Sequence, residues 1–154
     1  MPKTTFESLE ALRSKIGQEI AVGDWTAVTQ EQINLFAEAT GDHQWIHLDQ
    51  KRAAAESPYG TTIAHGFLTL SLIPRLMADT LQLPKAKMSV NYGLNRVRFA
   101  APVPAGKKVR PRVTLLGIED VPGGVQMNWK VTIEVEGSEK PACIAETIAR
   151  HYTD

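Results

Sequence analysis

Residues 125–136 alternate strictly between apolar and polar side chains. Successive side chains of a β-strand point to opposite faces of its sheet, so this pattern predicts a strand with one buried and one solvent-facing side. A strand of this kind must pack its apolar face against a second layer, which the rest of the chain has to supply. The buried face is predicted to carry Val125, Met127, Trp129, Val131, Ile133 and Val135.

Three further stretches predict strands around this one. Residues 109–115 alternate in the same way and reach it through a turn at Pro122-Gly123-Gly124, and residues 142–152 follow it after Gly137-Ser138. In residues 88–99 the apolar positions change from even to odd numbers, which predicts a β-bulge or bend around residues 93–95. A shorter strand is expected at residues 20–22, before Gly23-Asp24.

The second layer is predicted to be a helix over residues 67–81. This segment is apolar nearly all round, as expected of a buried helix, and Pro74 should kink it or remove one internal hydrogen bond. A buried helix followed by a run of antiparallel strands predicts an α+β fold. We expect an antiparallel sheet of five strands wrapped around one long buried helix, in a single domain over residues 1–154.

Two helices are expected before this core. Residues 6–16 carry apolar side chains at helical spacing. Thr29 and Gln32 have the spacing of a capping box for the next helix, and Gly41 has the place of a C-terminal stop. Residues 48–64 predict an irregular connection with one short helix that Asp49 caps, forming a lid or a wall of the site.

Asp42 and His47 follow the Gly41 stop. Five positions is a poor spacing for contact on one helix, so we expect the two side chains to converge across a loop or bent turn. A carboxylate and an imidazole aimed at one point can hold and deprotonate a water molecule. The ordinary alternative is an Asp that completes a turn and a His on the surface.

His43 and His65 raise a second alternative. Asp42, His43, His47 and His65 could surround zinc. The pairing of His43 with His47 would need a helix through the Gly41 stop, so we expect no metal. His65 is expected to bond backbone near the start of the following helix, while the amide of Gly66 at that start could bind a developing oxyanion. Gly66 could equally serve close packing.

These motifs together resemble a known family. Phe36, Thr40-Gly41-Asp42, Ile46-His47, His65-Gly66 and the segment 98–103 match the pattern of MaoC-type dehydratases and (R)-specific enoyl-CoA hydratases. The resemblance covers roughly residues 15–152, and it is strongest to small single-domain members that include relatives of nodulation protein N. It implies the hot-dog fold.

The resemblance also implies a reaction. A trans-2-enoyl-CoA thioester would be interconverted with its (R)-3-hydroxyacyl thioester through a water held by Asp42 and His47, without metal or redox cofactor. Gly66 would stabilise the thioester oxygen, with His65 beside it. Two open alternatives are an acyl-CoA thioesterase on the same fold and a non-catalytic acyl-thioester-binding accessory protein of the nodulation type.

The chain departs from the family pattern at three positions. Gln44 and Trp45 replace the usual Asn and Pro, which affects the loop shape and the acyl pocket. Pro74 stands where some members carry a Ser, so Ser71 is the nearest hydroxyl that could touch substrate. Trp45 and Phe67 are the expected aromatic lining.

Residues 85–112 contain basic side chains and no acidic one, in a chain whose formal charge is zero. This local excess suits the phosphates of coenzyme A, with Arg96, Lys108 and Arg110 as candidates, although solvated strand edges would look the same. The neutral balance gives no indication of a nucleic-acid partner. We expect acyl-CoA or an acyl-carrier thioester as the partner.

The compartment and assembly follow from simpler features. A single cysteine, no signal-like start and no apolar run long enough to span a membrane predict a soluble cytoplasmic protein. An open antiparallel sheet has edges that invite pairing, and residues 87–99 are the expected edge of a homodimer.

Overall fold

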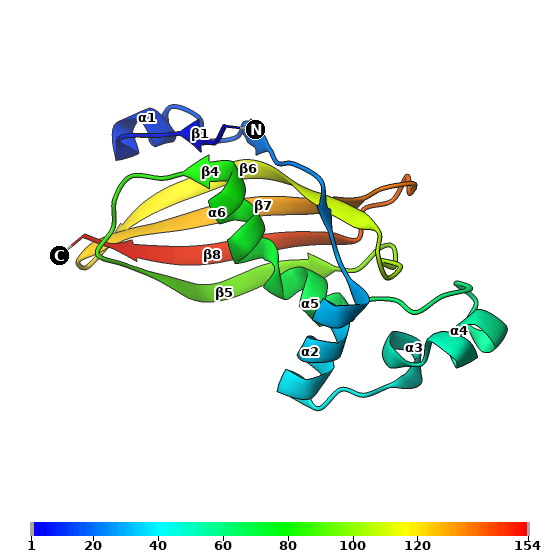
Figure 1. Ribbon diagram of the computed structural model, residues 1–154. Helices are drawn as coiled ribbons and strands as arrows, with labels where there is room; N and C mark the ends of the chain where they lie inside the picture. Colours follow the sequence, from blue (N-terminus) through cyan, green and yellow to red (C-terminus); the bar gives the residue numbers. More distant parts are fainter. Residues whose placement is uncertain (1, 154) are drawn as a thin grey trace.

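The computed structural model describes residues 2–153, and its main element is a six-stranded antiparallel sheet (Figure 1). Its strands run in the order β2-β6-β7-β8-β5, and β3 also pairs with β6. A separate parallel pair joins β1 to β4. The strands are β1 (Thr4–Thr5), β2 (Glu19–Val22), β3 (Thr26–Ala27), β4 (Leu81–Gln82), β5 (Met88–Arg98), β6 (Lys108–Val121), β7 (Gly124–Val135) and β8 (Cys143–Tyr152).

The inner face of the sheet forms the core. Every apolar position predicted for residues 125–135 is buried, and Trp129 is only 1% exposed. The helices α5 (Gly66–Ser71) and α6 (Ile73–Thr80) cross this face (Figure 1). The predicted α+β hot-dog arrangement, a sheet wrapped around a helical layer, is therefore confirmed.

The central helix differs from its prediction in two respects. It is divided at Leu72 into α5 and α6, and Pro74 stands in the first turn of α6, where a missing N–H costs no internal bond. It is also not buried all round, because the sheet covers only one of its sides. Leu68, Ile73 and Leu76 face the core, whereas Phe67 is 66% exposed.

The helices before the core follow their predicted capping signals. α2 (Gln30–Thr40) has the predicted Thr29–Gln32 capping box and ends at Gly41, whose φ of 82° is left-handed. α1 (Leu9–Arg13) is shorter than the predicted 6–16. Ser8 caps it, and Phe6 instead donates its backbone N–H to the carbonyl of Gln82 in β4.

The connection before α5 also matches its prediction and lies with α2. It contains α3 (Trp45–Leu48) and α4 (Gln50–Glu56), and the Asp49 carboxylate caps α4 by accepting from the Arg52 amide. In Figure 1, α2, α3 and α4 gather at the end of the sheet where α5 begins. Among residues 2–153, no helix has both the length and the apolarity needed to cross a membrane.

Strand β5 is an edge of the sheet, as predicted. Its register with β8 shifts twice, between Asn91 and Gly93 and between Leu94 and Arg96, which confirms the predicted irregularity around residues 93–95. The sheet has six strands rather than the five expected, because β3 also pairs with β6.

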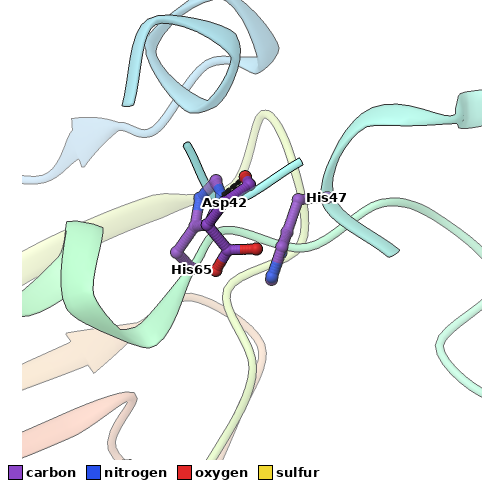
Figure 2. A group of neighbouring side chains, drawn as sticks. All are labelled: Asp42, His47 and His65. Atoms are coloured by element: carbon purple, nitrogen blue, oxygen red, sulfur yellow. Dashed lines mark hydrogen bonds between the residues drawn. The ribbon is translucent and has the colours of Figure 1, made fainter. Parts of the chain in front are cut away.

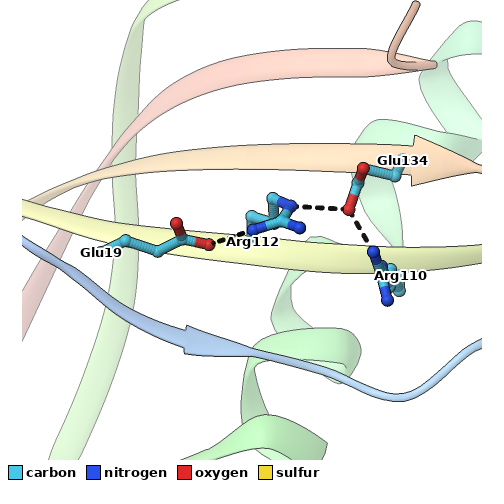
Figure 3. Close-up of polar contacts among 4 residues, drawn as sticks. All are labelled: Glu19, Arg110, Arg112 and Glu134. Carbon is cyan, nitrogen blue, oxygen red and sulfur yellow. Dashed lines mark hydrogen bonds and ion pairs between the residues drawn. The ribbon is translucent and has the colours of Figure 1, made fainter. Parts of the chain in front are cut away.

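The outer face of the sheet carries a charged network (Figure 3). One carboxylate oxygen of Glu134 on β7 accepts from Arg110 at 2.9 Å and from Arg112 at 2.7 Å, and Arg112 also pairs with Glu19 on β2 at 2.8 Å. Burial alone would raise the pKa of Glu134, but the hydrogen bonds from the two arginines outweigh it and hold the pKa below its usual value. The network ties β7 to β6 and β2.

We predict that Glu134→Gln lowers the free energy of unfolding at pH 7 by about 1 kcal/mol, because two charge-assisted bonds lose their charge. A carboxylate with a depressed folded-state pKa stabilises the protein above its unfolded pKa, and this stabilisation is lost as the pH falls through the folded pKa. The difference between variant and wild type should therefore disappear in acid. Urea unfolding at neutral and acidic pH measures it.

The matched control is Glu139→Gln, at an exposed position in the turn between β7 and β8. It should leave stability unchanged at both pH values. Equal effects of the two substitutions at pH 7 would contradict a specific role for the network.

Candidate active site

The candidate site lies where α2 ends, α3 turns and α5 begins. Gly41 ends α2 in a left-handed conformation, so the chain leaves the helix and places Asp42 in the following loop. His47 lies in α3, and His65 is the residue before the first turn of α5. The predicted convergence of Asp42 and His47 across a bent loop is therefore what the structure shows.

Three side chains converge on one point: Asp42, His47 and His65 (Figure 2). One side-chain ligand atom from each lies within 4.8 Å of the other two. The His47 and His65 rings stack with centroids 3.9 Å apart and planes at 25°. His47 is 7% and His65 2% exposed, whereas Asp42 is exposed, so the cluster has a buried side and an open side.

Two backbone carbonyls determine which ring nitrogens carry protons. His47 Nδ1 lies 2.8 Å from the Ile63 carbonyl oxygen, and His65 Nε2 lies 3.1 Å from the Asp42 carbonyl oxygen. A carbonyl only accepts, so both of these nitrogens must donate. In the neutral rings, His47 Nε2 and His65 Nδ1 then hold the free lone pairs. His65 Nδ1 is buried and has no partner among the described residues.

Burial sets the charge state of His47. Removal from water is the largest effect and lowers the pKa of His47, and the nearby His65 ring lowers it further. The Ile63 carbonyl and Asp42 act in the opposite direction without reversing the shift. His47 is therefore neutral at neutral pH and presents a basic Nε2 toward the cluster.

The spacing of this cluster suits a bound water molecule. Two groups that hydrogen-bond one water lie roughly 4.5 Å apart, which falls within the 4.8 Å limit of the cluster. A neutral imidazole can take a proton from that water, and a carboxylate can orient it. The arrangement can therefore perform general acid–base chemistry.

The same three residues have the ligand types of a metal site. Asp42, His47 and His65 could each offer one atom, but His43 is exposed and lies outside the cluster, so the four-residue zinc set considered from the sequence is not assembled. One nitrogen of each ring is already bound to a carbonyl. The ring nitrogens open to an ion are the two that hold the free lone pairs.

Gly66 is placed against an aromatic ring. A Cβ atom at this position would come within 2.9 Å of the Phe99 ring, so only glycine fits without a shift. The amides of Gly66 and Phe67 precede the first bonds within α5, in which Leu68 and Thr69 donate to the His65 carbonyl. Gly66 therefore combines close packing with free amides beside the cluster of Asp42, His47 and His65.

The other predicted contact residues lie around this cluster without entering it. Trp45 is half-buried in α3 beneath the Arg52 guanidinium, 4.1 Å from the ring centre. Phe67 meets Phe99 edge to face. Ser71 donates its hydroxyl to the Phe67 carbonyl at 2.7 Å, one turn earlier. His65 bonds backbone as expected, but its partner is Asp42 rather than the start of α5.

The predicted phosphate-binding residues do not form one patch. Arg96 lies on β5, while Lys108 and Arg110 lie on β6, with β7 and β8 between them. Arg110 is already paired with Glu134 and stacked over Trp25, and the Lys108 amide bonds Glu136. Arg96 is 81% exposed, against 27% for Arg110, and lies 3.8 Å from Glu146.

Sequence reasoning missed Gln30, whose side chain holds the two segments around His47. Its amide nitrogen donates to the His47 carbonyl at 2.8 Å and to Asn34 at 2.9 Å, while its oxygen accepts from Thr62 at 2.5 Å. Thr62 precedes Ile63, whose carbonyl orients the His47 ring. Only the position of Gln30 in the first turn of a capped helix was visible in the sequence.

A large cavity was also missed. It has a volume of about 890 Å³ and lies between the central helices and strands β5 and β8. Leu70 and Ser71, at the end of α5, line it, but Asp42, His47 and His65 do not. The cavity therefore reaches the end of α5, the helix that begins beside the cluster.

Comparison with known proteins identifies the family. Residues 11–137 match the MaoC like domain. The chain is 55% identical over 148 residues to 3-hydroxyacyl-thioester dehydratase Z of Mycobacterium tuberculosis, covering 96% of this chain and 97% of the relative. It is 44% identical to nodulation protein N of Rhizobium meliloti, covering 92% and 89%. The chain belongs to the MaoC-like dehydratase family, and it is an enzyme of the hydro-lyase class.

Solved structures support the fold. R-hydratase PhaJ1 from Pseudomonas aeruginosa superimposes with a TM-score of 0.70 at 24% identity, covering 90% of this chain and 83% of that chain. The (R)-hydratase from A. caviae gives a TM-score of 0.67 at 22% identity, covering 84% and 96%. The hot-dog fold expected from the sequence is shared with these hydratases.

We predict that Gln30→Leu lowers dehydratase kcat by one to two orders of magnitude, because a small displacement of a catalytic group can cost about that much. The variant keeps the side-chain size but releases the His47 carbonyl and Thr62. The fall should be larger in kcat than in KM, and steady-state kinetics measure both.

Gln32→Leu is the control. Gln32 lies in the same helical turn and makes the capping-box bond, so its loss should reduce stability without affecting kcat. Equal kinetic effects of the two substitutions would show that Gln30 acts through helix stability alone.

Proposed function

We propose that this enzyme interconverts a trans-2-enoyl thioester and the (R)-3-hydroxyacyl thioester. The observation that carries the proposal is the free Nε2 of a buried, neutral His47 whose ring clusters with the Asp42 carboxylate. The relative that is 55% identical is named as a 3-hydroxyacyl-thioester dehydratase, which supports this substrate class.

In the proposed hydration, Asp42 and His47 hold one water molecule. His47 Nε2 accepts a proton from the water as its oxygen bonds to C3 of the enoyl group. The electron pair of the double bond moves to C2 and the thioester carbonyl. The pair then returns a proton to C2, so that one water is added and both catalytic groups regain their starting state.

We propose that the Gly66 amide stabilises the negative charge that develops on the thioester oxygen. Free amides at a helix start point outward and carry partial positive charge. Preorganised donors of this kind are worth roughly 3–4 kcal/mol when they act on a developing oxyanion. The Phe99 ring packs against Gly66 beside this position.

The cavity between the central helices and β5 and β8 is proposed to take the acyl chain. Its volume of about 890 Å³ is at the upper end of the usual range for ligand pockets. Ser71 lines this cavity, whereas Trp45 and Phe67 are proposed to contact the substrate before it enters. For the coenzyme A or carrier phosphates, Arg96 is the strongest candidate because it is open, while Lys108 and Arg110 are secondary candidates on the far side of the sheet.

The proposed assembly is a homodimer joined along β5. This edge strand exposes a row of large apolar side chains, and Phe67 and Phe99 continue that surface toward the catalytic cluster. An exposed apolar edge strand is unfavourable in isolation and is commonly covered by a partner. The exposed side chains on β5 are Met88, Val90, Tyr92 and Leu94.

We predict that Asp42→Asn and His47→Gln each reduce kcat for crotonyl-CoA hydration by about 10²–10⁴, the usual contribution of an acid–base group. Each substitute has a similar size but cannot exchange a proton. Wild-type kcat/KM should fall in acid as the lowered pKa of His47 is passed, because the neutral ring is the active form. Loss of absorbance of the enoyl thioester measures the rate.

The matched control is His43→Gln, one residue after Asp42 and outside the cluster, which should keep wild-type activity. Dialysis against a strong chelator should also leave the rate unchanged, since the scheme needs no metal. Near-wild-type activity in Asp42→Asn or His47→Gln, or activity restored by zinc after chelation, would contradict the scheme. Release of free coenzyme A instead of hydration would indicate a thioesterase.

We predict that Val90→Glu on β5 separates the dimer, because it places two like charges near the two-fold axis in an apolar contact. Sedimentation velocity should show a monomer with much reduced activity. Leu35→Glu, at an exposed apolar position of α2, should remain dimeric. A fully active wild-type monomer would contradict the assembly.

A further inference from the structure

The His65 side chain connects the start of α5 to the segments around it. Its ring stacks on the His47 ring of α3 with centroids 3.9 Å apart, and it meets the Phe36 ring of α2 at 4.9 Å. Its Nε2 donates to the Asp42 carbonyl at 3.1 Å, in the loop between those helices (Figure 2). Its own carbonyl accepts from the Leu68 amide in the first turn of α5. One residue therefore contacts α2, α3 and the intervening loop.

The bond from His65 is what ties Asp42 to the rest of the protein. Asp42 is exposed and lies outside any helix or strand. Its amide and its carboxylate bond only within the loop, to the Thr40 hydroxyl at 3.4 Å and from the Gln44 amide at 3.3 Å. Among the described residues, only His65 forms a hydrogen bond with Asp42 from outside residues 40–44. The place of the Asp42 carboxylate beside His47 therefore depends on His65.

Neither ring nitrogen of His65 is available to a substrate. Nε2 is bonded to the Asp42 carbonyl, while Nδ1 is buried and has no partner among the described residues. The residue as a whole is only 2% exposed. His65 therefore cannot serve as the acid, the base or the oxyanion donor. It can act on the reaction only through the groups that it holds.

Packing alone does not explain a histidine at this position. A phenylalanine ring would fill a similar space and stack on the same neighbours. It would also avoid a buried nitrogen without a partner, which is unfavourable. What phenylalanine lacks is the N–H group that bonds the Asp42 carbonyl. The useful property of the histidine is therefore the combination of a flat ring with a donor at its far end.

We propose that His65 is a positioning residue, which aligns the Asp42 carboxylate and the His47 ring with the Gly66 amide. This inference rests on the proposed function, since it assumes that these three groups act on one thioester. Because His65 directly precedes Gly66, a single ring sets the catalytic pair relative to the oxyanion donor. Such alignment affects the chemical step, in which a displacement of about 1 Å can cost about a hundredfold in rate.

The kinetic test compares two substitutions of His65. His65→Phe keeps a ring against Phe36 and His47 but loses the bond to Asp42, so kcat for crotonyl-CoA hydration should fall about a hundredfold with little change in KM. His65→Gln loses the ring, but its amide nitrogen can still donate to the Asp42 carbonyl, so it should keep more of the activity. A merely structural role predicts the reverse order, because His65→Phe preserves the packing. That reverse order would overturn the inference.

A double-mutant cycle tests whether His65 acts through Asp42. In the Asp42→Asn background the carboxylate is already lost, so adding His65→Phe should lower kcat little further. Two residues that act independently would instead multiply their effects. The same hundredfold fall in both backgrounds would overturn the inference, and so would a wild-type kcat in His65→Phe alone.

Crystal structures of the two variants give a measurement that does not depend on activity. We expect the Asp42 carboxylate to move relative to Gly66 by roughly 1 Å in His65→Phe and to stay in place in His65→Gln. A His65→Gln structure in which the Asp42 carbonyl has no donor, combined with wild-type kcat, would overturn the inference even if His65→Phe did not fold.

The same structures keep this inference separate from the proposed reaction. A wild-type protein that hydrates no enoyl thioester would contradict the reaction, whereas displacement of Asp42 in His65→Phe would still support the hold of His65 on the loop. An unmoved Asp42 in His65→Phe, with crotonyl-CoA hydration intact in the wild type, would overturn the positioning role and leave the reaction standing.

Discussion

The burial of the apolar face of β6 and β7 against α5 and α6 is the constraint on which the rest of the structure depends. Trp129 and its neighbours along β7 are almost completely removed from water, and each such large side chain contributes roughly 1.5–3 kcal/mol. This contact fixes the axis of the central helix across the sheet. Because His65 immediately precedes α5, this contact also fixes where the cluster of Asp42, His47 and His65 forms.

A second requirement is that a ring nitrogen in the cluster keeps a free lone pair and can act as a base. Backbone carbonyls determine which nitrogen this is. Ile63 and Asp42 each accept a proton-bearing ring nitrogen, so neither imidazole can turn without losing a buried hydrogen bond. Gln30 in turn holds the His47 carbonyl and Thr62, the neighbour of Ile63. The protonation pattern of the site is thus determined by main-chain geometry, and the groups that position the cluster are not the side chains proposed to react.

Short sequence patterns predicted the features that depend on interactions between residues close together in the chain. The alternation at residues 125–135, the capping box at Thr29 and the stop at Gly41 each act within a few residues, and all three are confirmed. Features that depend on contacts between distant segments could not be predicted from the sequence. The pairing of Gln30 with Thr62, the Phe99 ring on Gly66 and the separation of Arg96 from Arg110 by two strands arise only when remote segments meet. Phe67 is exposed because the sheet covers only one side of its helix.

Gly66 shows that close packing and chemistry need not be alternatives at a catalytic position. The Phe99 ring lies so close that a Cβ atom at this position would have to displace it. The same ring lies beside the amides at the start of α5, which have no partner within the helix. Preorganised donors at such a helix start stabilise a developing negative charge. The close contact between Phe99 and Gly66 therefore leaves the Gly66 amide available as the oxyanion donor that we propose.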